Sequence, residues 1–355
     1  MPGIMLDIAD HAVRVVSENL DRLPIDFAAG KPAVRAEGHR TRFFRSPSRA
    51  SVRVIVESGS AYVRLWVKQT RDAPGAFELM CEVRSRLRES GSAGAVPEPL
   101  CFSAVDNLLV MREFRGKPLT LRTLPPVSIL SSGGIPRSLE RLYRNIGGWL
   151  ARYHSAMAVG GEASFDALLE KLRRALEGDN HFDAAEKRRL GERLAAVDRS
   201  LGRERSLTLT QPHNDFCLRN ILVGRGDAFA VVDWDAALHP EFESRAPVWN
   251  DITAFVLNIR SLSRFAPFVS SAALSRLAGS FMRGYFPDKP IDAHKIGLHL
   301  WFFSLCYYVG LIGDRPLYRI YAGRHSERFA RRLRKNLLLG PDATETQFDN
   351  CGTDG

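Results

Sequence analysis

The sequence predicts an α+β protein with an N-terminal helix, an antiparallel sheet and one further helix in its first third, and a larger, mainly helical remainder. In the first third, β-branched and aromatic residues alternate with polar ones in short runs bounded by turn-forming residues, which is typical of strands. Further along, apolar residues recur at helical spacing, most clearly over residues 138–158. A chain of 355 residues is long enough to bury two cores.

The first domain is expected to span residues 1–113. Its helices show apolar residues every three or four positions, and its strands alternate with a period of two. The predicted elements are, in order, a helix at 8–20, strands at 42–45, 52–56 and 62–69, a helix at 75–88, and strands at 100–104 and 108–113 that turn at Asp106-Asn107.

The second domain is expected to span residues 114–340, with a polar, acidic tail at 341–355. A segment rich in Pro, Ser and Gly at residues 119–135 leads into it. Its predicted elements are a helix at 138–158, further helices within 165–201, a short strand and a hairpin within 207–235, and helices within 267–285, 294–313 and 315–339.

The formal charge of +10 raises the question of a polyanionic partner. The basic residues are spread over helical faces, and the densest cluster, Arg328–Lys335, fits a solvated helix face; an anionic substrate or a membrane surface is the second interpretation. No zinc-finger spacing, ribonucleoprotein motif or homeodomain-like pattern accompanies the charge. We therefore expect no nucleic-acid partner.

The cysteines and the apolar runs favour a cytoplasmic protein. The five cysteines are odd in number and show no metal-ligand spacing, which indicates reduced thiols. The N-terminal residues include acids and lack an apolar signal core. The longest apolar run, Leu300–Gly313, is too short to cross a bilayer, so we expect no transmembrane segment.

Residues 207–235 carry the clearest chemical pattern. Two apolar arms, 221–223 and 229–232, flank the turn signal Gly224-Arg225-Gly226-Asp227, which predicts a hairpin. Such a hairpin would bring the polar loop before it towards the acids after it. An Asp on a loop, with an Asn and a second Asp nearby, is the set that phosphoryl transfer uses for a base and for two magnesium ligands.

The motif His213-x-Asp215-x4-Asn220, followed thirteen residues later by Asp233, resembles the catalytic core of the aminoglycoside phosphotransferase and choline kinase family. These enzymes are small-molecule relatives of the protein kinases. The resemblance implies a bilobal protein-kinase-like fold, with Asp215 as the catalytic base and Asn220 and Asp233 as ligands of Mg²⁺. A chance polar loop beside a hairpin is the alternative.

The resemblance also assigns supporting residues around this core. His213 is expected to be a scaffold residue, and Asp251, just after a Trp-Asn pair, to brace the catalytic loop. Asp235 either supports the metal, binds a second ion, or caps the following segment.

Nucleotide binding is expected in the first domain. The resemblance makes Lys68, at a strand end, the lysine of the ATP phosphates, held by Glu82 with Glu78 in reserve. It places adenine against the backbone of Arg112 and Phe114. Ser48 lies in the loop 46–51, which occupies the position of a glycine-rich phosphate loop but contains no glycine.

The leading hypothesis is an ATP- and Mg²⁺-dependent phosphotransferase acting on a hydroxyl of a small molecule, such as a sugar, an aminoglycoside, a choline-like alcohol or a lipid-linked saccharide. The glycine-free loop and Asn214, where these kinases mostly carry glycine, depart from the family pattern. They motivate the alternative of a catalytically silent, nucleotide-binding pseudokinase. A protein kinase is disfavoured, because neither Asp-Phe-Gly nor Ala-Pro-Glu is present. The acceptor, the choice of ATP or GTP and the oligomeric state stay open at this point.

Overall fold

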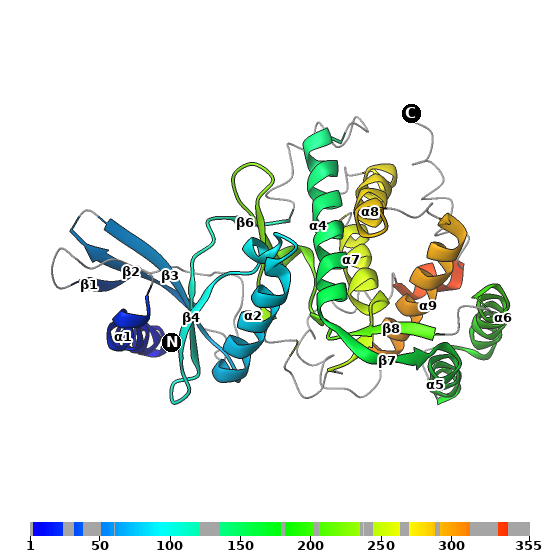
Figure 1. Cartoon of the computed structure of the whole chain (residues 1–355). Helices are drawn as coiled ribbons and strands as arrows, with labels where there is room; N and C mark the ends of the chain where they lie inside the picture. Colours follow the sequence, from blue (N-terminus) through cyan, green and yellow to red (C-terminus); the bar gives the residue numbers. More distant parts are fainter. Residues whose placement is uncertain are drawn as a thin grey trace. The chain divides into compact units, whose positions relative to one another are not determined.

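The computed structural model describes residues 3–23, 32–37, 51–59, 61–120, 135–178, 182–201, 206–234, 237, 244–262, 270–287, 292–312 and 333–339. Contacts between residues divide the chain into two units. The N-terminal unit comprises Met1–Lys117 and Ile221–His239, and the C-terminal unit comprises Pro118–Asn220 and Pro240–Gly355. Figure 1 shows the helices and strands of both, coloured along the chain.

The N-terminal unit is built on a five-stranded antiparallel sheet in the order β1-β2-β3-β5-β4. The hairpin β9–β10 belongs to the same unit, although more than one hundred residues separate it from the sheet in sequence. The elements are α1 (Gly3–Glu18), η1 (Leu20–Arg22), β1 (Ala33–Glu37), β2 (Ser51–Ser58), β3 (Ala61–Gln69), α2 (Ala73–Arg88), η2 (Ala93–Ala95), β4 (Pro99–Ser103), β5 (Leu108–Arg112), β9 (Ile221–Val223) and β10 (Phe229–Val231), with β6 (Lys117–Pro118) beside β9.

Helix α1 covers one face of this sheet. Its buried apolar side chains pack against alternate residues of β2, β3 and β5; this core contains Ile8, Ala12, Val15, Val16, Val52, Val54, Val56, Leu65, Val67, Leu108 and Val110. Because side chains alternate across a strand, Trp66 and Lys68 project from the other face of β3. Arg14 fixes α1 to the β4–β5 turn through two hydrogen bonds to Asp106, at 2.8 and 2.9 Å.

Helix α2 packs on β4 and β5. It begins where the side chain of Asp72 accepts a hydrogen bond from the Gly75 N–H at 2.9 Å, and Pro74 suits the first turn. Its buried stripe consists of Ala73, Ala76, Leu79, Met80, Val83 and Leu87, and Glu78 and Glu82 lie on the exposed side.

The ring of Phe114 joins the end of β5 to the β9–β10 hairpin. A Cβ atom added at Gly116 would lie 2.7 Å from this ring, and one added at Gly224 would lie 3.1 Å from it. The two glycines therefore leave room for Phe114, which holds the hairpin that leads to Asp233.

The C-terminal unit is mainly helical, with a small antiparallel sheet in the order β11-β8-β7. Helices α4 and α8 cross in close contact, because Gly147 and Gly284 let the backbone of each helix touch the other; an added Cβ would overlap Phe281 or Arg144. The elements are α4 (Arg137–Ala156), β7 (Ala158–Ser164), α5 (Phe165–Gly178), α6 (Ala184–Leu201), β8 (Ser206–Thr210), η3 (Leu218–Asn220), β11 (Ala246–Pro247), α7 (Trp249–Ser261), α8 (Ser271–Tyr285) and α9 (Ala293–Ile312).

The predicted α+β class is confirmed, and most predicted elements are found within a few residues of their expected ends. The longer elements β1, β7 and α7 were not predicted, and neither were the two-residue strands β6 and β11 or the three short 3-10 turns. The predicted strand at 42–45 and the tail at 341–355 lie outside the described residues. Among the helices that the structure describes, none is both long and apolar enough to span a membrane.

Candidate active site

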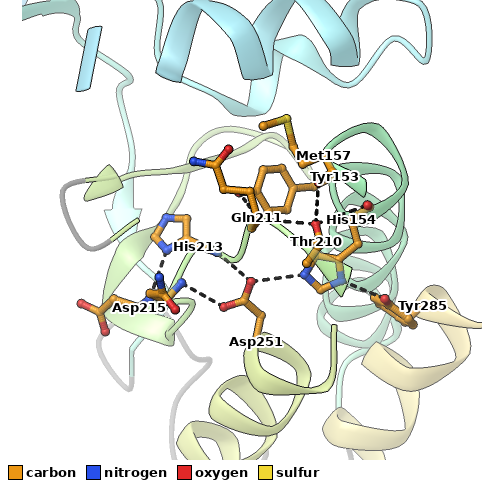
Figure 2. A network of polar contacts seen from close by, with 10 residues as sticks. Tyr153, His154, Met157, Thr210, Gln211, His213, Asp215, Asp251 and Tyr285 are labelled. Atoms are coloured by element: carbon orange, nitrogen blue, oxygen red, sulfur yellow. Dashed lines mark hydrogen bonds and ion pairs between the residues drawn. The ribbon is translucent and has the colours of Figure 1, made fainter. Parts of the chain in front are cut away.

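The loop that carries Asp215, the predicted base, is held by the buried side chain of Asp251, in the first turn of α7. One carboxylate oxygen, Oδ2, accepts hydrogen bonds from the His213 N–H at 2.8 Å and from His154 Nε2 at 3.2 Å. The other, Oδ1, accepts one from the Asn214 N–H at 3.1 Å. Figure 2 shows these contacts converging on the carboxylate. Asp251 is only 1% exposed. A buried charge with this many donors is satisfied by fixed groups rather than by water.

Electrostatics favour the ionised form of Asp251. Burial alone raises the pKa of a carboxyl group, but the hydrogen bond and charge of His154, with the charge and N–H of His213, outweigh it. The pKa of Asp251 therefore lies below its ordinary value of 3.8. The network continues to α8, where the Tyr285 hydroxyl lies 2.8 Å from His154 Nδ1 (Figure 2).

Two residues of the loop fix its path. Asn214 has φ +64°, in the left-handed region that Asn and Gly adopt more readily than other residues. Phe216 is fully buried, with its ring 5.0 Å from that of Phe255 and 6.1 Å from that of Trp149. Asp215, between these two residues, is therefore placed by a turn on one side and a core anchor on the other.

The carboxylate of Asp215 is oriented by two neighbours on the same loop. Arg219 donates to Oδ2 at 2.8 Å, and Asn220 Nδ2 donates to the same oxygen at 2.9 Å. Asn220 Nδ2 also lies 3.0 Å from the Asp215 carbonyl, so its carbonyl oxygen Oδ1 is turned away from Asp215. The Asp215 side chain is 13% exposed. A partly buried carboxylate, held at one oxygen, is suited to accept a proton at the other.

The N-terminal unit contains a second polar centre. Lys68 Nζ lies 2.6 Å from Asp233 Oδ1, and both side chains are mostly buried. Asp233 has φ +72°, and a non-glycine residue held there is strained. The next residue, Trp234, is buried and donates from Nε1 to the Val231 carbonyl at 3.1 Å, which holds this turn in place.

The other residues predicted to bind the nucleotide are engaged in contacts within the N-terminal unit or lie outside the described residues. Glu82 does not pair with Lys68 in this structure, because it lies on the exposed side of α2 and forms an ion pair with Arg86 at 2.5 Å. The N–H of Arg112 donates to the Glu98 carbonyl at 2.8 Å, so this donor is already used within the sheet. Phe114 packs against Gly116 and Gly224 as described above. Two further predicted residues, Ser48 and Asp235, lie outside the described residues.

The residues predicted to hold magnesium have suitable donor atoms. Mg²⁺ prefers oxygen ligands and commonly takes only one or two from the protein, the rest coming from phosphate and water. Asn220 Oδ1 and the Asp233 carboxylate are of this kind. Within the described residues there is no group of three or more His, Cys, Asp or Glu able to hold a metal.

Two residues of the site were missed from sequence. Arg219 was not recognised as a partner of Asp215, although the spacing of four is the one at which side chains meet across a helical turn. Tyr285 is far from the loop in sequence, and no local pattern connects it to His154. An arginine or a tyrosine does not stand out in a chain that contains many basic and aromatic residues.

Comparison with known proteins assigns the chain to a family. Residues 42–239 match the family model described as "Phosphotransferase enzyme family". Because this match covers more than half of the chain, the protein belongs to the phosphotransferase enzyme family, and the resemblance found from the motifs is confirmed. No curated protein matches the sequence significantly.

Solved structures show the fold. A glucosamine kinase superposes with a TM-score of 0.53 at 17% identity, over 92% of this chain and 85% of that chain. A choline/ethanolamine kinase family protein from Mesorhizobium loti gives 0.47 at 16% identity, over 94% and 98% of the two chains. Choline kinase LicA from Streptococcus pneumoniae gives 0.48 at 13% identity, over 94% and 99%. The predicted fold, an N-terminal antiparallel sheet followed by a mainly helical part of kinase-like type, is confirmed.

Proposed function

We propose that this protein transfers the γ-phosphate of ATP to a hydroxyl group of a small molecule. The observation that supports the proposal is that the four motif residues are present and lie in two contacting pairs. Asn220 donates a hydrogen bond to Asp215 at 2.9 Å in one unit, and Lys68 pairs with Asp233 at 2.6 Å in the other. Membership of the phosphotransferase family supports it. A chain that had lost the chemistry would be expected to have lost at least one of these four residues.

In this mechanism Asp215 accepts the proton of the acceptor hydroxyl through its carboxylate. The hydroxyl oxygen forms a bond to the γ-phosphorus, the bond from that phosphorus to the β-phosphate oxygen breaks, and ADP leaves. Lys68 binds the nucleotide phosphates, and Asn220 and Asp233 would hold Mg²⁺. When bound, Mg²⁺ neutralises charge that develops on the phosphate oxygens. His213 and Asp251 keep the loop in position rather than touch the substrate.

Nucleotide binding and acceptor binding are assigned to the two domains predicted from sequence. Residues 1–113 would bind the nucleotide, and residues 114–340 would supply the base and the acceptor site. Glu82 or Glu78 would pair with Lys68 in a nucleotide-bound state. The four cysteines that the structure describes are unpaired thiols, which is consistent with a cytoplasmic location where ATP and Mg²⁺ are abundant.

The acceptor is proposed to be neutral or anionic. The guanidinium of Arg219, one third of whose side chain is exposed, lies 2.8 Å from the carboxylate of Asp215 and offsets its charge. A cationic acceptor would therefore gain little attraction there and would meet a like charge. Sugars and lipid-linked saccharides fit this setting better than aminoglycosides or choline-like alcohols.

The test is ATP turnover with Mg²⁺ against a panel of sugars, amino sugars, choline-like alcohols and aminoglycosides. In Asp215→Asn, transfer should fall about 10²–10⁴-fold while thermal stability changes little, because the amide replaces the base without changing its volume. Asp198→Asn, at a carboxylate on α6 that is 32% exposed, is the matched control and should be fully active. Magnesium-dependent ATP binding without turnover of any acceptor would instead favour the silent pseudokinase.

A further inference from the structure

Tyr285, the last residue of α8, lies at the close crossing of α8 with α4. A Cβ atom added at Gly147 of α4 would lie 3.0 Å from the backbone nitrogen of Tyr285. His154 follows Gly147 by seven residues, which is two helical turns along the same side of α4. The crossing thus brings the Tyr285 ring to His154, with the two ring centres 5.7 Å apart.

Three side chains connect α8 to the loop that carries the predicted base. The Tyr285 hydroxyl lies 2.8 Å from His154 Nδ1. On the other side of the same ring, His154 Nε2 lies 3.2 Å from Asp251 Oδ2. Asp251 in turn accepts the N–H groups of His213 and Asn214. Figure 2 shows these side chains in sequence between α8 and the loop.

The protons on this path are placed by the groups beside them. The ionised carboxylate of Asp251 can only accept, so His154 Nε2 carries a proton. Burial and the charge of Asp251 raise the pKa of Tyr285, so its hydroxyl keeps its proton. A hydroxyl can donate or accept, and it therefore suits Nδ1 in the neutral and in the charged ring. Both bonds form in one orientation of the ring, because turning the ring over replaces both nitrogens by carbons.

The loop depends on Asp251 because its path is unfavourable. Asn214 has φ +64°, a sparsely populated region, and its N–H is bonded to Asp251 Oδ1 at 3.1 Å. Asp215 is the next residue, so a relaxation of the backbone at Asn214 would move its carboxylate. A displacement of about 1 Å, caused by a change far from the chemistry, can slow a reaction about 100-fold.

We propose that Tyr285 is a positioning residue for the base Asp215. Its hydroxyl holds the His154 ring at Nδ1 and so keeps Nε2–H on Asp251. Asp251 then keeps the loop in the form that presents the Asp215 carboxylate to the acceptor. This role rests on the proposed function, because it requires a reaction in which Asp215 accepts a proton.

The first experiment measures kcat and the KM for ATP well below the Tm, with the acceptor that the wild-type protein turns over fastest. Tyr285→Phe removes the hydroxyl and keeps the ring, so kcat should fall about tenfold while the KM for ATP stays within about twofold. Tyr143→Phe is the matched control. The Tyr143 hydroxyl, on α4, is also buried but has no hydrogen-bond partner among the described residues, so its removal should leave kcat unchanged.

A double-mutant cycle tests the route through His154. His154→Gln should lower kcat at least as much as Tyr285→Phe does. Adding Tyr285→Phe to His154→Gln should then lower kcat by less than about twofold, because the hydroxyl has lost the ring through which it acts. Losses that simply multiply would show that the hydroxyl acts by another route, and they would overturn the proposal.

The third measurement does not depend on turnover. Spectra of the whole chain labelled with ¹⁵N-histidine report the proton and the hydrogen bond at each ring nitrogen, and His154 is assigned by the loss of its signals in His154→Gln. The Nε2 of His154 should carry a proton, and the Nδ1 signal should move in Tyr285→Phe but not in Tyr143→Phe. If Tyr285→Phe does not fold, the wild-type spectrum is the test, and an Nε2 without a proton would overturn the proposal.

The outcomes separate this role from the proposed function. A Tyr285→Phe protein with a lower Tm and an unchanged kcat would show that the hydroxyl serves stability alone. That result would overturn the positioning role and leave the proposed function standing. A wild-type protein that turns over no acceptor would overturn both.

Discussion

Replacing Asp251 by Asn should cost this protein a large part of its stability. The carboxylate accepts three hydrogen bonds, from the N–H groups of His213 and Asn214 and from His154, at 2.8 to 3.2 Å. Asn offers one acceptor oxygen and presents an NH₂ group where the other oxygen was, so at least one buried donor meets a donor. Hydrogen bonds to a charged group contribute about 1.5–3 kcal/mol each, and a buried donor left unpaired costs about 1–3 kcal/mol. We expect a loss of about 2–4 kcal/mol.

The assay is thermal or urea unfolding, followed by circular dichroism, of wild type, Asp251→Asn and Asp198→Asn. For a domain of this size the loss corresponds to a Tm lower by roughly 5–15 °C. Asp198→Asn should stay within about 0.5 kcal/mol of wild type, because its ion pair is long, at 3.5 Å, and exposed. An Asp251→Asn protein as stable as this control would refute the claim that the buried carboxylate holds the loop.

The same variant gives a pH dependence with a defined sign. The pKa of Asp251 in the folded protein is below its ordinary 3.8, so the folded state favours the ionised form. The resulting stabilisation is fully present above about pH 4 and is lost as the pH falls through the lower folded pKa. The difference in unfolding free energy between wild type and Asp251→Asn should therefore be largest near neutral pH and shrink in acid. A difference that grows in acid would contradict the assignment.

Two further predictions concern the helix crossing and the base. Gly284→Ala should destabilise the C-terminal unit by about 1–3 kcal/mol or more, since the added methyl group overlaps the backbone of Arg144. Gly191→Ala, with open space around it in α6, should instead stabilise the protein by about 0.5–1 kcal/mol. The urea unfolding midpoints of the two variants test this, and equal midpoints would contradict it. Arg219→Gln should lower turnover about 10- to 100-fold, because the carboxylate of Asp215 loses an orienting partner. The Tm should change little, because the arginine side chain of this ion pair is one third exposed. Unchanged turnover at saturating substrate would show that Asn220 alone is enough to orient Asp215.

The elements that the sequence predicts well are those whose burial pattern is local. Strand β3 alternates over nine residues, so the face of Lys68 followed directly from the period of two. The pairing of Lys68 with Glu82 stays a prediction: in this structure Glu82 lies on the exposed side of α2 and pairs with Arg86. Strand β1 has a single partner, β2, and its short run carries too few apolar residues to stand out.

Contacts between distant residues were the second limit. The motif pointed to Asp251 as a brace, but the donors that it serves and the link from His154 to Tyr285 depend on where α4, α7 and α8 pack. The packing of α4 on α8 depends in turn on Gly147 and Gly284, each of which contacts the backbone of the other helix. The sequence around a glycine in a helix does not indicate which other helix it contacts.

In each unit, the charged motif residues already lie in ion pairs. Lys68 is paired with Asp233, and Asp215 with Arg219, each within one unit and each partly buried. Removing one partner of such a pair would leave a partly buried charge without its counter-ion, which is destabilising. On the proposed function, phosphate groups that bind Lys68 would compete with Asp233, and a cation bound by Asp233 would relieve that competition. Nucleotide and Mg²⁺ should therefore bind cooperatively, each with weak affinity in the absence of the other.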